Sequence, residues 1–409
     1  MVSVSSIFSR IAVLTWCDSD RRHLLLTYKL YNISLVLSIS PSGLFALTGR
    51  IFFLLYCKML EDMIKCRISK LIEKDCYRMN TKISARPTYF DKFVCAADKC
   101  RHSCCAPGWE IDIDSESAAR YRRMRGSLGR ELRENIQYID GEASFKLCAD
   151  GRCPFLNDRG LCRIILERDE DALCDICREH PRFYNLLPYR EETGLGIYCE
   201  AVCKLVINET EPSGIIEQEL PCYDGEYDDY TEDEVRLCLA LAERRGNAIK
   251  TVTDPSLPFY ERIGMICREY GISDDDACFV KTTDMLGYMR TLEPLDGTWI
   301  PLIDALAEHF EEIKGTDLGE YVKVFENLTV YYLYRYYIRA FDGDHAPSAY
   351  VRFAVLSVRF IGLALAYARL NKQCELSEEE IVDVICNYSD QIESCEENVD
   401  ALLKRLSEC

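Results

Sequence analysis

The chain has little positive charge for its length. Its 409 residues include 49 lysines and arginines against 68 aspartates and glutamates, so that the net charge is −19. Nucleic acids bind proteins largely through basic side chains that neutralise phosphates. We therefore expect no nucleic-acid partner.

Long apolar runs are also missing. The stretches Ile11–Trp16, Leu30–Ile39 and Gly43–Tyr56 are separated by polar or charged residues, and none reaches the roughly 18 residues that a membrane-spanning helix needs. The first residues do not follow the pattern of a secretion signal. These absences predict a cytoplasmic protein without stable membrane association.

Changes in composition divide the chain into four segments. We expect residues 1–78 to be a non-native or poorly ordered extension, with the natural start at Met79, because the cysteine-rich sequence begins soon after that methionine. Residues 79–205 are predicted to be a cysteine-rich, loop-rich metal-binding domain. Residues 206–230 are a predicted linker and residues 231–409 an all-helical domain, so the predicted fold class is mainly α.

Helix signals are clearest in the C-terminal half. Thr231 with Glu234, and Ser377 with Glu380, are capping-box patterns. In such a pattern, the side chain of each of the two residues accepts a hydrogen bond from the backbone N–H group of the other. Apolar positions recur at three- and four-residue spacing. They predict helices over 231–245, 257–270, 275–292, 299–314, 318–341, 347–370 and 377–406, the last one split near 387–389. In the cysteine-rich unit, Ser115–Arg133 is a predicted helix with its first residue as the cap.

Cysteine, in contrast, is abundant. The chain has 23 cysteines, and eleven of them lie between residues 95 and 203. Thiolates at short spacing are soft metal ligands, and four of them suffice for zinc or an iron–sulfur cluster. A chain of this length can bury a core without disulfides, which favours metal over cystine.

The clustered cysteines occur in short-spaced groups on separate loops, which together can complete a four-ligand shell. The predicted metal ligands are Cys100, Cys104, Cys105, Cys153, Cys162, Cys174, Cys177 and Cys199. Only Cys174 and Cys177 form the tight pair typical of zinc, and His102 and His180 are the only imidazoles nearby. Cysteine-only ligation therefore favours a 4Fe–4S cluster, with zinc as the alternative metal. One cluster needs only four thiolates, so the remaining clustered cysteines are spare, buried or part of a second site.

The order of these motifs resembles the flagellin lysine-N-methylase family and the broader group of cysteine-rich domains that chelate zinc or iron. The similarity spans Pro87–Ile207 and extends weakly into the helical half at Glu326–Leu328. The residues that carry it are Cys100, Cys104, Cys105, Gly108, Trp109, Ile113, Asp114, Cys153–Leu156, Gly160–Cys162, Leu173, Cys174, Cys177, Pro181, Arg182, Asn185 and Cys199–Ala201.

This resemblance implies a methyl transfer. The family moves a methyl group from S-adenosylmethionine to lysine ε-amines of flagellin, its protein partner, and an iron–sulfur cluster accompanies the activity. The alternative is a non-catalytic zinc- or iron-chelating protein. No glycine-rich nucleotide loop opens a helix in this sequence. The Cys-x3-Cys spacings at Cys100 and Cys199 lack the third cysteine of radical S-adenosylmethionine enzymes. The donor site therefore has no motif, and no catalytic residue is assigned.

Two further sets of side chains are candidates for binding. Trp109, beside the double cysteine, would shield a cluster from water or stack on the adenine of the donor. A methyl acceptor must be a neutral amine, whereas free lysine has a pKa of about 10.4, so acidic or phenolic groups near the cysteines are candidates for contacts. These are Asp112, Asp114, Tyr184, Tyr198 and Glu200, for each of which a structural role is the simpler interpretation.

The segment Tyr331–Tyr337 contains five tyrosines. Tyrosines spread around a helix would not all point into one core. We predict that Tyr331, Tyr334 and Ile338 pack inward and that the others lie at a helix–helix boundary. A substrate groove lined by tyrosines is the alternative.

Overall fold

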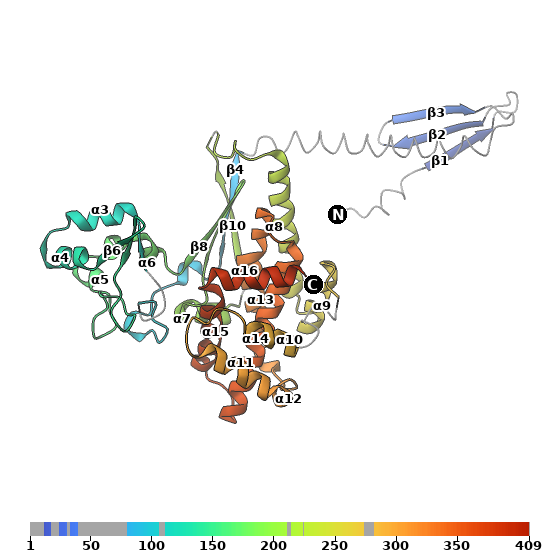
Figure 1. The fold of residues 1–409 in the computed structure, drawn as a ribbon. Helices are drawn as coiled ribbons and strands as arrows, with labels where there is room; N and C mark the ends of the chain where they lie inside the picture. Colours follow the sequence, from blue (N-terminus) through green and yellow to red (C-terminus); the bar gives the residue numbers. More distant parts are fainter. Residues whose placement is uncertain are drawn as a thin grey trace. The chain divides into compact units, whose positions relative to one another are not determined.

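The structure is a computed structural model (Figure 1). It describes residues 12–17, 24–30 and 33–39 as strands, and residues 80–105, 111–210, 214–223, 225–273 and 282–408, with side chains in the last range from Asp284. The contacts divide the chain into two units, Met1–Arg78 and Met79–Cys409. In the first unit, β1 (Ala12–Cys17), β2 (Leu24–Leu30) and β3 (Ile33–Ile39) form an antiparallel sheet in the order β1-β2-β3. The non-native origin of residues 1–78 stays a prediction.

The second unit is helical in its C-terminal half, as the sequence predicted. Its helices there are α8 (Glu232–Val252), α9 (Phe259–Glu269), α10 (Thr282–Met289), α11 (Trp299–Glu308), α12 (Phe310–Ile313), α13 (Val322–Tyr336), α14 (Pro347–Lys372), α15 (Glu378–Glu393) and α16 (Glu396–Ser407). Short 3₁₀ helices, Gly319–Tyr321 and Tyr337–Asp342, flank α13. Both predicted capping boxes form, at Thr231 and Ser377. The break between the last two helices falls at residues 394–395, later than expected.

Helix α13 runs through the core of this half. It contacts α7 (Glu200–Ile207), α8 and α14, so that several of its sides are covered at once. All five tyrosines of the 331–337 segment are buried. Tyr332 and Tyr336 meet Phe353 of α14, at the helix–helix boundary predicted for them. Four of the five rings belong to the larger hydrophobic core of this unit, whereas Tyr334 is buried outside it, so the five rings do not all share one core.

Helix α14 is the one described helix that is long and apolar enough to cross a membrane by length and composition. In its most apolar window, 83% of the residues are buried inside the protein. Its burial against α13, α15 and α16 accounts for this composition, since a helix that is apolar on all sides is expected in the core of a large domain.

A four-stranded sheet accompanies the helices. Its order is β10 (Ile215–Pro221), β4 (Thr81–Pro87), β9 (Arg190–Leu195) and β8 (Arg182–Leu187). Strands β4 and β9 are parallel, and the other pairs are antiparallel. The segment 206–230, predicted as a linker, therefore supplies an edge strand. Its exposed glutamates made this segment look like a solvated linker in the sequence, although charged side chains are usual on edge strands.

The cysteine-rich unit is loop-rich, with a second sheet and short helices. Strands β5 (Asp112–Ile113), β7 (Glu142–Phe145) and β6 (Ile136–Ile139) pair in that order, and α5 (Arg163–Glu167) and α6 (Asp175–Glu179) follow. The helix predicted over residues 115–133 is in fact two, α3 (Ser115–Arg123) and α4 (Gly126–Glu134), because Met124 and Arg125 between them have extended backbone. The cap is Asp114, which accepts the Ser117 N–H at 2.7 Å, and not Ser115.

The two hydrophobic cores of the second unit divide the chain differently from the predicted domains. The smaller core joins Ile111 and its neighbours with residues up to Cys174. The larger core takes the helical half together with Leu187, Leu195, α7 and Tyr89. The two ends of the cysteine-rich segment thus pack with the helical half, and residue 205 is not a boundary between cores.

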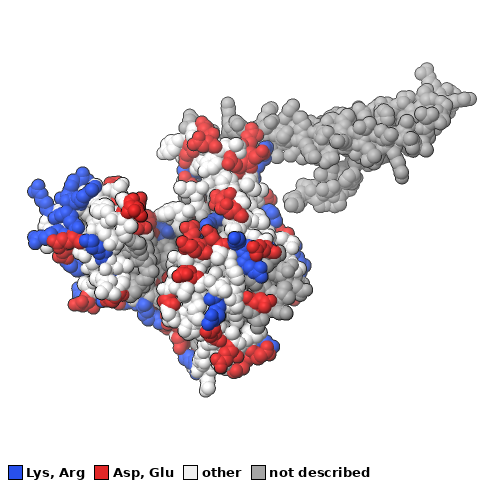
Figure 2. Space-filling view, viewed as in Figure 1, with Lys and Arg blue, Asp and Glu red and all other residues white. Residues whose placement is uncertain are grey.

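Charge is unevenly distributed over the visible surface. Figure 2 shows basic side chains gathered over α3 and α4, whereas acidic side chains are spread over the helical half. The exposed arginines of these two helices and the turn between them are Arg122, Arg123, Arg125, Arg130 and Arg133.

Candidate functional site

Five cysteines gather around the smaller core, and we call them the core thiol group: Cys105, Cys153, Cys162, Cys174 and Cys177. Cys153 and Cys174 are buried members of that core, and the other three pack against it. The backbone holds their loops together, because Cys153 N–H donates to the carbonyl of Cys105 at 3.0 Å and Cys162 pairs with Leu156 in a β-bridge. Residues more than 70 positions apart in sequence thereby converge on one place.

The electrostatics of the core thiol group show how close these thiols are. Burial raises the pKa of Cys153 to about 12, and the charge of Cys105 adds to that rise. A hydrogen bond with the Cys177 thiol lowers the pKa of Cys174 and raises that of Cys177. Burial also raises the pKa of Cys162, again with a contribution from Cys105. Metal binding at these thiols would have to release their protons.

A second set of thiols lies at the start of α7, and we call it the helix thiol group: Cys95, Cys100, Cys104 and Cys199. Cys199 is the residue before the helix. Burial raises the pKa of Cys100 to about 11, and the charge of Cys199 adds to it. Cys104 is in electrostatic reach of Cys95 and Cys199 and bonds the thiol of Cys105. The adjacent cysteines at 104 and 105 thus connect the two groups.

The segment that carries the helix thiol group is fixed to the helical half. Arg101 N–H donates to Glu200 Oε2 at 2.7 Å, and the Arg101 guanidinium and the His102 ring each lie 2.9 Å from Asp383 on α15. Burial alone would raise the pKa of Glu200, but the Lys204 ammonium and the Arg101 N–H hold it at about 2. Glu200 therefore anchors this segment, which is a structural role.

The structure separates the eight predicted metal ligands into these two groups. Five belong to the core thiol group, and Cys100, Cys104 and Cys199 to the helix thiol group. Among the residues that the structure describes, no three histidine, cysteine, aspartate or glutamate side chains are placed to hold a metal ion. A 4Fe–4S cluster takes one thiolate at each of four irons, so the donors of the core thiol group suit a cluster in number and chemistry. The assignment of ligands stays a prediction.

The other candidates mostly have structural partners. Asp114 caps α3 and also accepts Asp175 N–H at 3.0 Å, and exposed Tyr184 donates to Glu179 at 2.6 Å. The ring of Tyr198 lies 5.5 Å from the guanidinium of Arg335. Asp112 is exposed on β5, and Trp109 lies outside the described residues.

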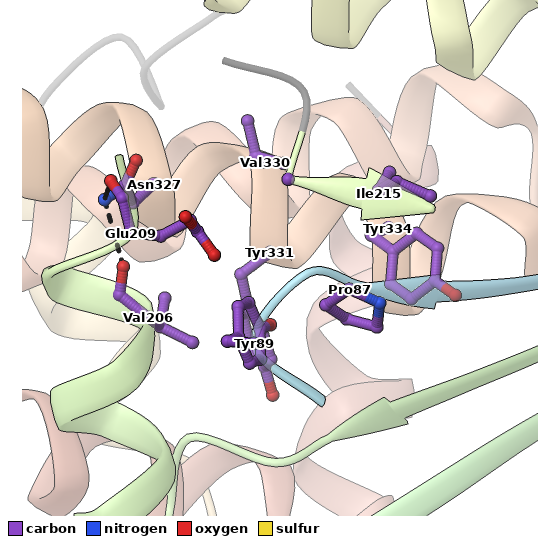
Figure 3. A pocket seen from close by; sticks show the side chains of 10 residues that line it. Pro87, Tyr89, Val206, Glu209, Ile215, Asn327, Val330, Tyr331 and Tyr334 are labelled. Carbon is purple, nitrogen blue, oxygen red and sulfur yellow. Dashed lines mark hydrogen bonds between the residues drawn. The ribbon is translucent and has the colours of Figure 1, made fainter. Parts of the chain in front are cut away.

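A narrow recess opens between the end of β4, the end of α7, the start of β10 and one face of α13 (Figure 3). The space counted out to its open mouth, including solvent, is about 370 Å³. Rings of Tyr89, Tyr331 and Tyr334 and the carboxylate of Glu209 line it. The tyrosine-rich segment pointed to two of these rings. Tyr89 and Glu209 carry no sequence signal, because contacts between segments far apart in the chain bring them to α13, such as the bond from the Asn327 amide to the Glu209 carbonyl at 2.9 Å.

The tyrosine hydroxyls of the recess point into the protein. Tyr331 donates to Glu393 at 2.7 Å and accepts from Arg335 at 2.7 Å. Tyr334 bonds the carbonyls of Ala85 and Thr193 at 2.9 and 3.0 Å. With their hydroxyls satisfied there, these tyrosines present ring surface to the recess.

A larger pocket lies on the other face of α13, against Phe325 and Thr329. It measures about 1,090 Å³ out to its mouth and is lined mostly by apolar residues of α9, α12 and α14, with Lys314 and Arg359 among its lining. At 100° per residue, these α13 positions are opposite to Tyr331 and Tyr334. The two hollows therefore do not communicate across the helix.

Comparison with known proteins adds to this geometry. Residues 195–409, more than half of the chain, match the family of the FliB lysine N-methylase C-terminal domain. The chain belongs to the FliB lysine N-methylase family. This confirms the family that the cysteine motifs indicated.

Relatives of this FliB family member are distant. It is 25% identical over 138 residues to the "Lysine-N-methylase" of Salmonella typhimurium, which covers 32% of this chain and 34% of that protein. The same identity and length relate it to the "Flagellar biosynthetic protein FliU" of Salmonella muenchen, of which 81% is covered. The matched segment thus spans about a third of the length of the lysine N-methylase. No solved structure matches the chain.

Proposed function

We propose that this member of the FliB family is a protein-lysine methyltransferase that takes its methyl group from S-adenosylmethionine and acts on flagellin. The match of residues 195–409 to the FliB C-terminal domain carries the proposal. The names of its relatives, lysine N-methylase and a flagellar biosynthetic protein, support it.

The proposed reaction is a displacement at carbon. The lysine ε-ammonium first loses a proton, since its pKa of about 10.4 keeps it charged at neutral pH. The nitrogen lone pair then forms the N–C bond while the methyl–sulfur bond breaks, and that electron pair stays on sulfur. The products are methyl-lysine and S-adenosylhomocysteine. The protein has to place the amine and exclude water while this happens.

We further propose that a 4Fe–4S cluster occupies the core thiol group. Cys153 and Cys174, the two buried thiols, would be ligands, with Cys105, Cys162 and Cys177 to complete the four. Zinc is the alternative metal. When bound, the cluster would supply iron–thiolate bonds between loops that are otherwise held by short backbone contacts. We also propose the cytoplasm as the location, because all described cysteines are free thiols, which suits a reducing compartment.

A second candidate function is non-catalytic metal binding. Two separate groups of thiols favour it, because chelation needs donors and not a catalytic residue. The two functions differ in whether flagellin is modified.

One experiment tests both. The full chain is purified without oxygen, its iron and zinc are measured, a visible spectrum is recorded, and it is incubated with methyl-labelled S-adenosylmethionine and flagellin. Iron, a brown colour and label on lysine support the methyltransferase. Zinc without label would leave only the chelating protein.

Cysteine variants test the assignment of ligands. Cys153→Ser and Cys174→Ser should lose most of the iron, since each removes one of a small set of buried donors. Cys374→Ser is the matched control, because Cys374 is exposed and far in sequence from both thiol groups. Full iron content in both core variants would show that the ligands lie elsewhere.

A further inference from the structure

A dense cluster of arginines lies on two short helices of the cysteine-rich unit. Residues 120–133 contain six arginines, no lysine and one acid, Glu131, in a chain whose net charge is −19. Helix α3 ends in this segment, and α4 occupies most of the rest of it. Figure 2 shows that basic side chains gather here on the visible face, whereas acidic side chains are spread over the helical half. The segment is therefore a local exception to the charge of the chain.

Two of the six arginines have structural roles. Arg120 donates to the carbonyl of Leu173, a member of the smaller core, at 2.7 Å. Arg133 of α4 donates to the carbonyl of Met124, just after α3, at 2.7 Å. These bonds fix α3 to the core and to α4, so both arginines are accounted for within the chain.

The other four arginines, Arg122, Arg123, Arg125 and Arg130, are exposed. Their guanidinium groups form no ion pair and no hydrogen bond with any residue that the structure describes. We call these four residues the arginine patch. Because a guanidinium group is always charged in a protein, the patch presents four positive charges to the solvent.

Helix electrostatics account for only part of the patch. Arg122 and Arg123 lie in the last turn of α3, where the helix dipole favours positive charge. Arg125 is the residue before α4, where the dipole of that helix disfavours positive charge. Four like charges on two contacting helices also repel one another. The patch therefore lowers the stability of the folded chain unless a negatively charged ligand neutralises it.

The neighbouring side chains select among negatively charged ligands. A membrane surface would need exposed apolar side chains beside the basic ones, but the leucines of this segment, Leu128 and Leu132, are buried. Single-stranded nucleic acid would need exposed aromatic rings for stacking, and the one aromatic residue of the segment, Tyr121, is buried. Protein carboxylates need neither, because a guanidinium group binds a carboxylate through two parallel hydrogen bonds.

We propose that the arginine patch docks an acidic segment of a protein partner, and that this partner is the protein whose lysine is methylated. The docking follows from the charges on α3 and α4, and only the identity of the partner rests on the proposed function. The acidic remainder of the chain would repel the same segment, so the patch also fixes the orientation in which the partner binds.

The patch lies near the core thiol group. Asp114, at the start of α3, accepts the N–H of Asp175, which is the first residue of α6 and follows Cys174. The patch begins at the other end of α3, a helix of nine residues and therefore of about 13 Å. A docked segment is thus about one short helix away from the proposed cluster.

The first test is binding without methyl transfer. The full chain is titrated at low salt with a short polyglutamate peptide and, as matched control, with a polyglutamine peptide of the same length. We expect the glutamate peptide to bind roughly tenfold more tightly, and the difference to vanish at about 1 M salt, where charges are screened within about 3 Å. Equal binding of the two peptides at low salt would overturn the proposal. Tighter binding of an RNA oligonucleotide or of phosphatidylserine vesicles would overturn it as well.

Variants then locate the binding. Replacing the four arginines of the patch by glutamine should weaken binding of the glutamate peptide roughly tenfold. The matched control changes the net charge equally by replacing four exposed arginines of the helical half, namely Arg244, Arg268, Arg290 and Arg405. This control should lose no more than about half of the affinity, since an exposed charge more than about 10 Å away is largely screened. An equal loss in the two variants would contradict the proposal.

A milder variant keeps the test decisive if the fourfold change prevents folding, which circular dichroism shows. Arg125→Gln combined with Arg130→Gln leaves the two arginines that stabilise the end of α3. It should weaken binding of the glutamate peptide roughly threefold, and unchanged binding in this folded variant would also contradict the proposal.

Methyl transfer separates this inference from the function. With flagellin as substrate, the fourfold patch variant should raise KM severalfold and leave kcat nearly unchanged, because it alters docking and not the transfer step. If the wild-type protein labels flagellin and the variant labels it with the same KM, the patch does not dock this substrate although the methyltransferase stands. If the wild-type protein labels nothing but binds the glutamate peptide through the patch, the docking surface stands and the methyltransferase does not.

Discussion

Arg245 on α8 and Glu192 on β9 form an ion pair in which neither side chain is more than 2% exposed. Arg245 Nη1 lies 2.8 Å from Glu192 Oε2 and also donates to the carbonyl of Tyr334 at 3.0 Å. Arg190 bonds the same carboxylate. One acid thus joins the sheet to the helices, and its removal leaves two buried guanidiniums.

Glu192→Gln should therefore destabilise the protein by about 3–5 kcal/mol, as expected when one partner of a buried pair is removed. Urea unfolding followed by circular dichroism measures the loss. The control is Glu217→Gln, which removes the exposed partner of Arg190 and should cost no more than about 1 kcal/mol. An equal loss in the two variants would mean that the buried ion pair contributes no more to the free energy of unfolding than the exposed one.

The same pair gives a pH dependence. Burial alone would raise the pKa of Glu192, but Arg245 and Arg190 hold it below its usual range. Because the folded-state pKa is lower than the unfolded value of about 4.3, the stabilisation is complete above about pH 4.3. It is lost as the pH falls through the folded-state pKa. Unfolding free energy should drop below pH 4 in the wild type and drop less in Glu192→Gln.

Asp390 on α15 should act in the opposite sense. Burial raises its pKa to about 6, although His102 lowers it in part. The folded protein then holds this proton more tightly than the unfolded chain, so stability falls as the pH rises from about 4 to 6. Asp390→Asn should raise the free energy of unfolding by about 1–3 kcal/mol at pH 7.5 and change it little at pH 4. Asp400→Asn, at an exposed position of α16, should show no such difference between the two pH values.

Gly194 allows close packing of a ring on the sheet. A Cβ there would stand 2.1 Å from Cζ of Phe183, so Gly194→Ala should cost about 1–3 kcal/mol. Gly246→Ala is the control, since nothing lies within 4 Å of its added Cβ in α8, and it should stabilise the helix by up to about 1 kcal/mol. Thermal unfolding of both variants measures the contrast. A stable Gly194→Ala protein would show that Phe183 can move aside at little cost.

Glu200 should control the docking of the segment that carries Cys100 and Cys104. Its side chain is 2% exposed, and its carboxylate forms ion pairs with Arg101 and Lys204. In Glu200→Gln the charge is lost, and trypsin should cleave at Lys99 or Arg101 several times faster than in the wild type. Glu379→Gln alters an exposed acid on nearby α15 and should leave the rate as it is. No acceleration in Glu200→Gln would assign the docking to Asp383 alone.

Features set by neighbours in sequence were predictable, and features set by distant partners were not. Both capping boxes and most helices of the C-terminal half follow from residues within one turn of each other. The sheet was missed because β4 pairs with β9 and β10, more than 100 residues away. The long helix over 115–133 failed at Met124 and Arg125, whose extended backbone separates α3 from α4.

The candidate site shows the same division. Short spacings identified the cysteines as groups on loops, but which loops meet depends on the packing of the smaller core, and this places Cys104 and Cys105 in different groups. The tyrosine segment indicated Tyr331 and Tyr334. Glu209 could not be inferred from sequence, since a lone glutamate after a helix looks like any solvated acid.

The two cores have a consequence for how the molecule comes apart. Groups of residues that share buried contacts open together, and separate groups open at separate free energies. The smaller core has far fewer buried members than the larger one, so amide hydrogens of α3 and α4 should exchange with solvent well before those of α13 and α14. A calorimetric trace should then contain two transitions, the first belonging to the residues between β5 and α6, with the sheet and the helices intact until the second.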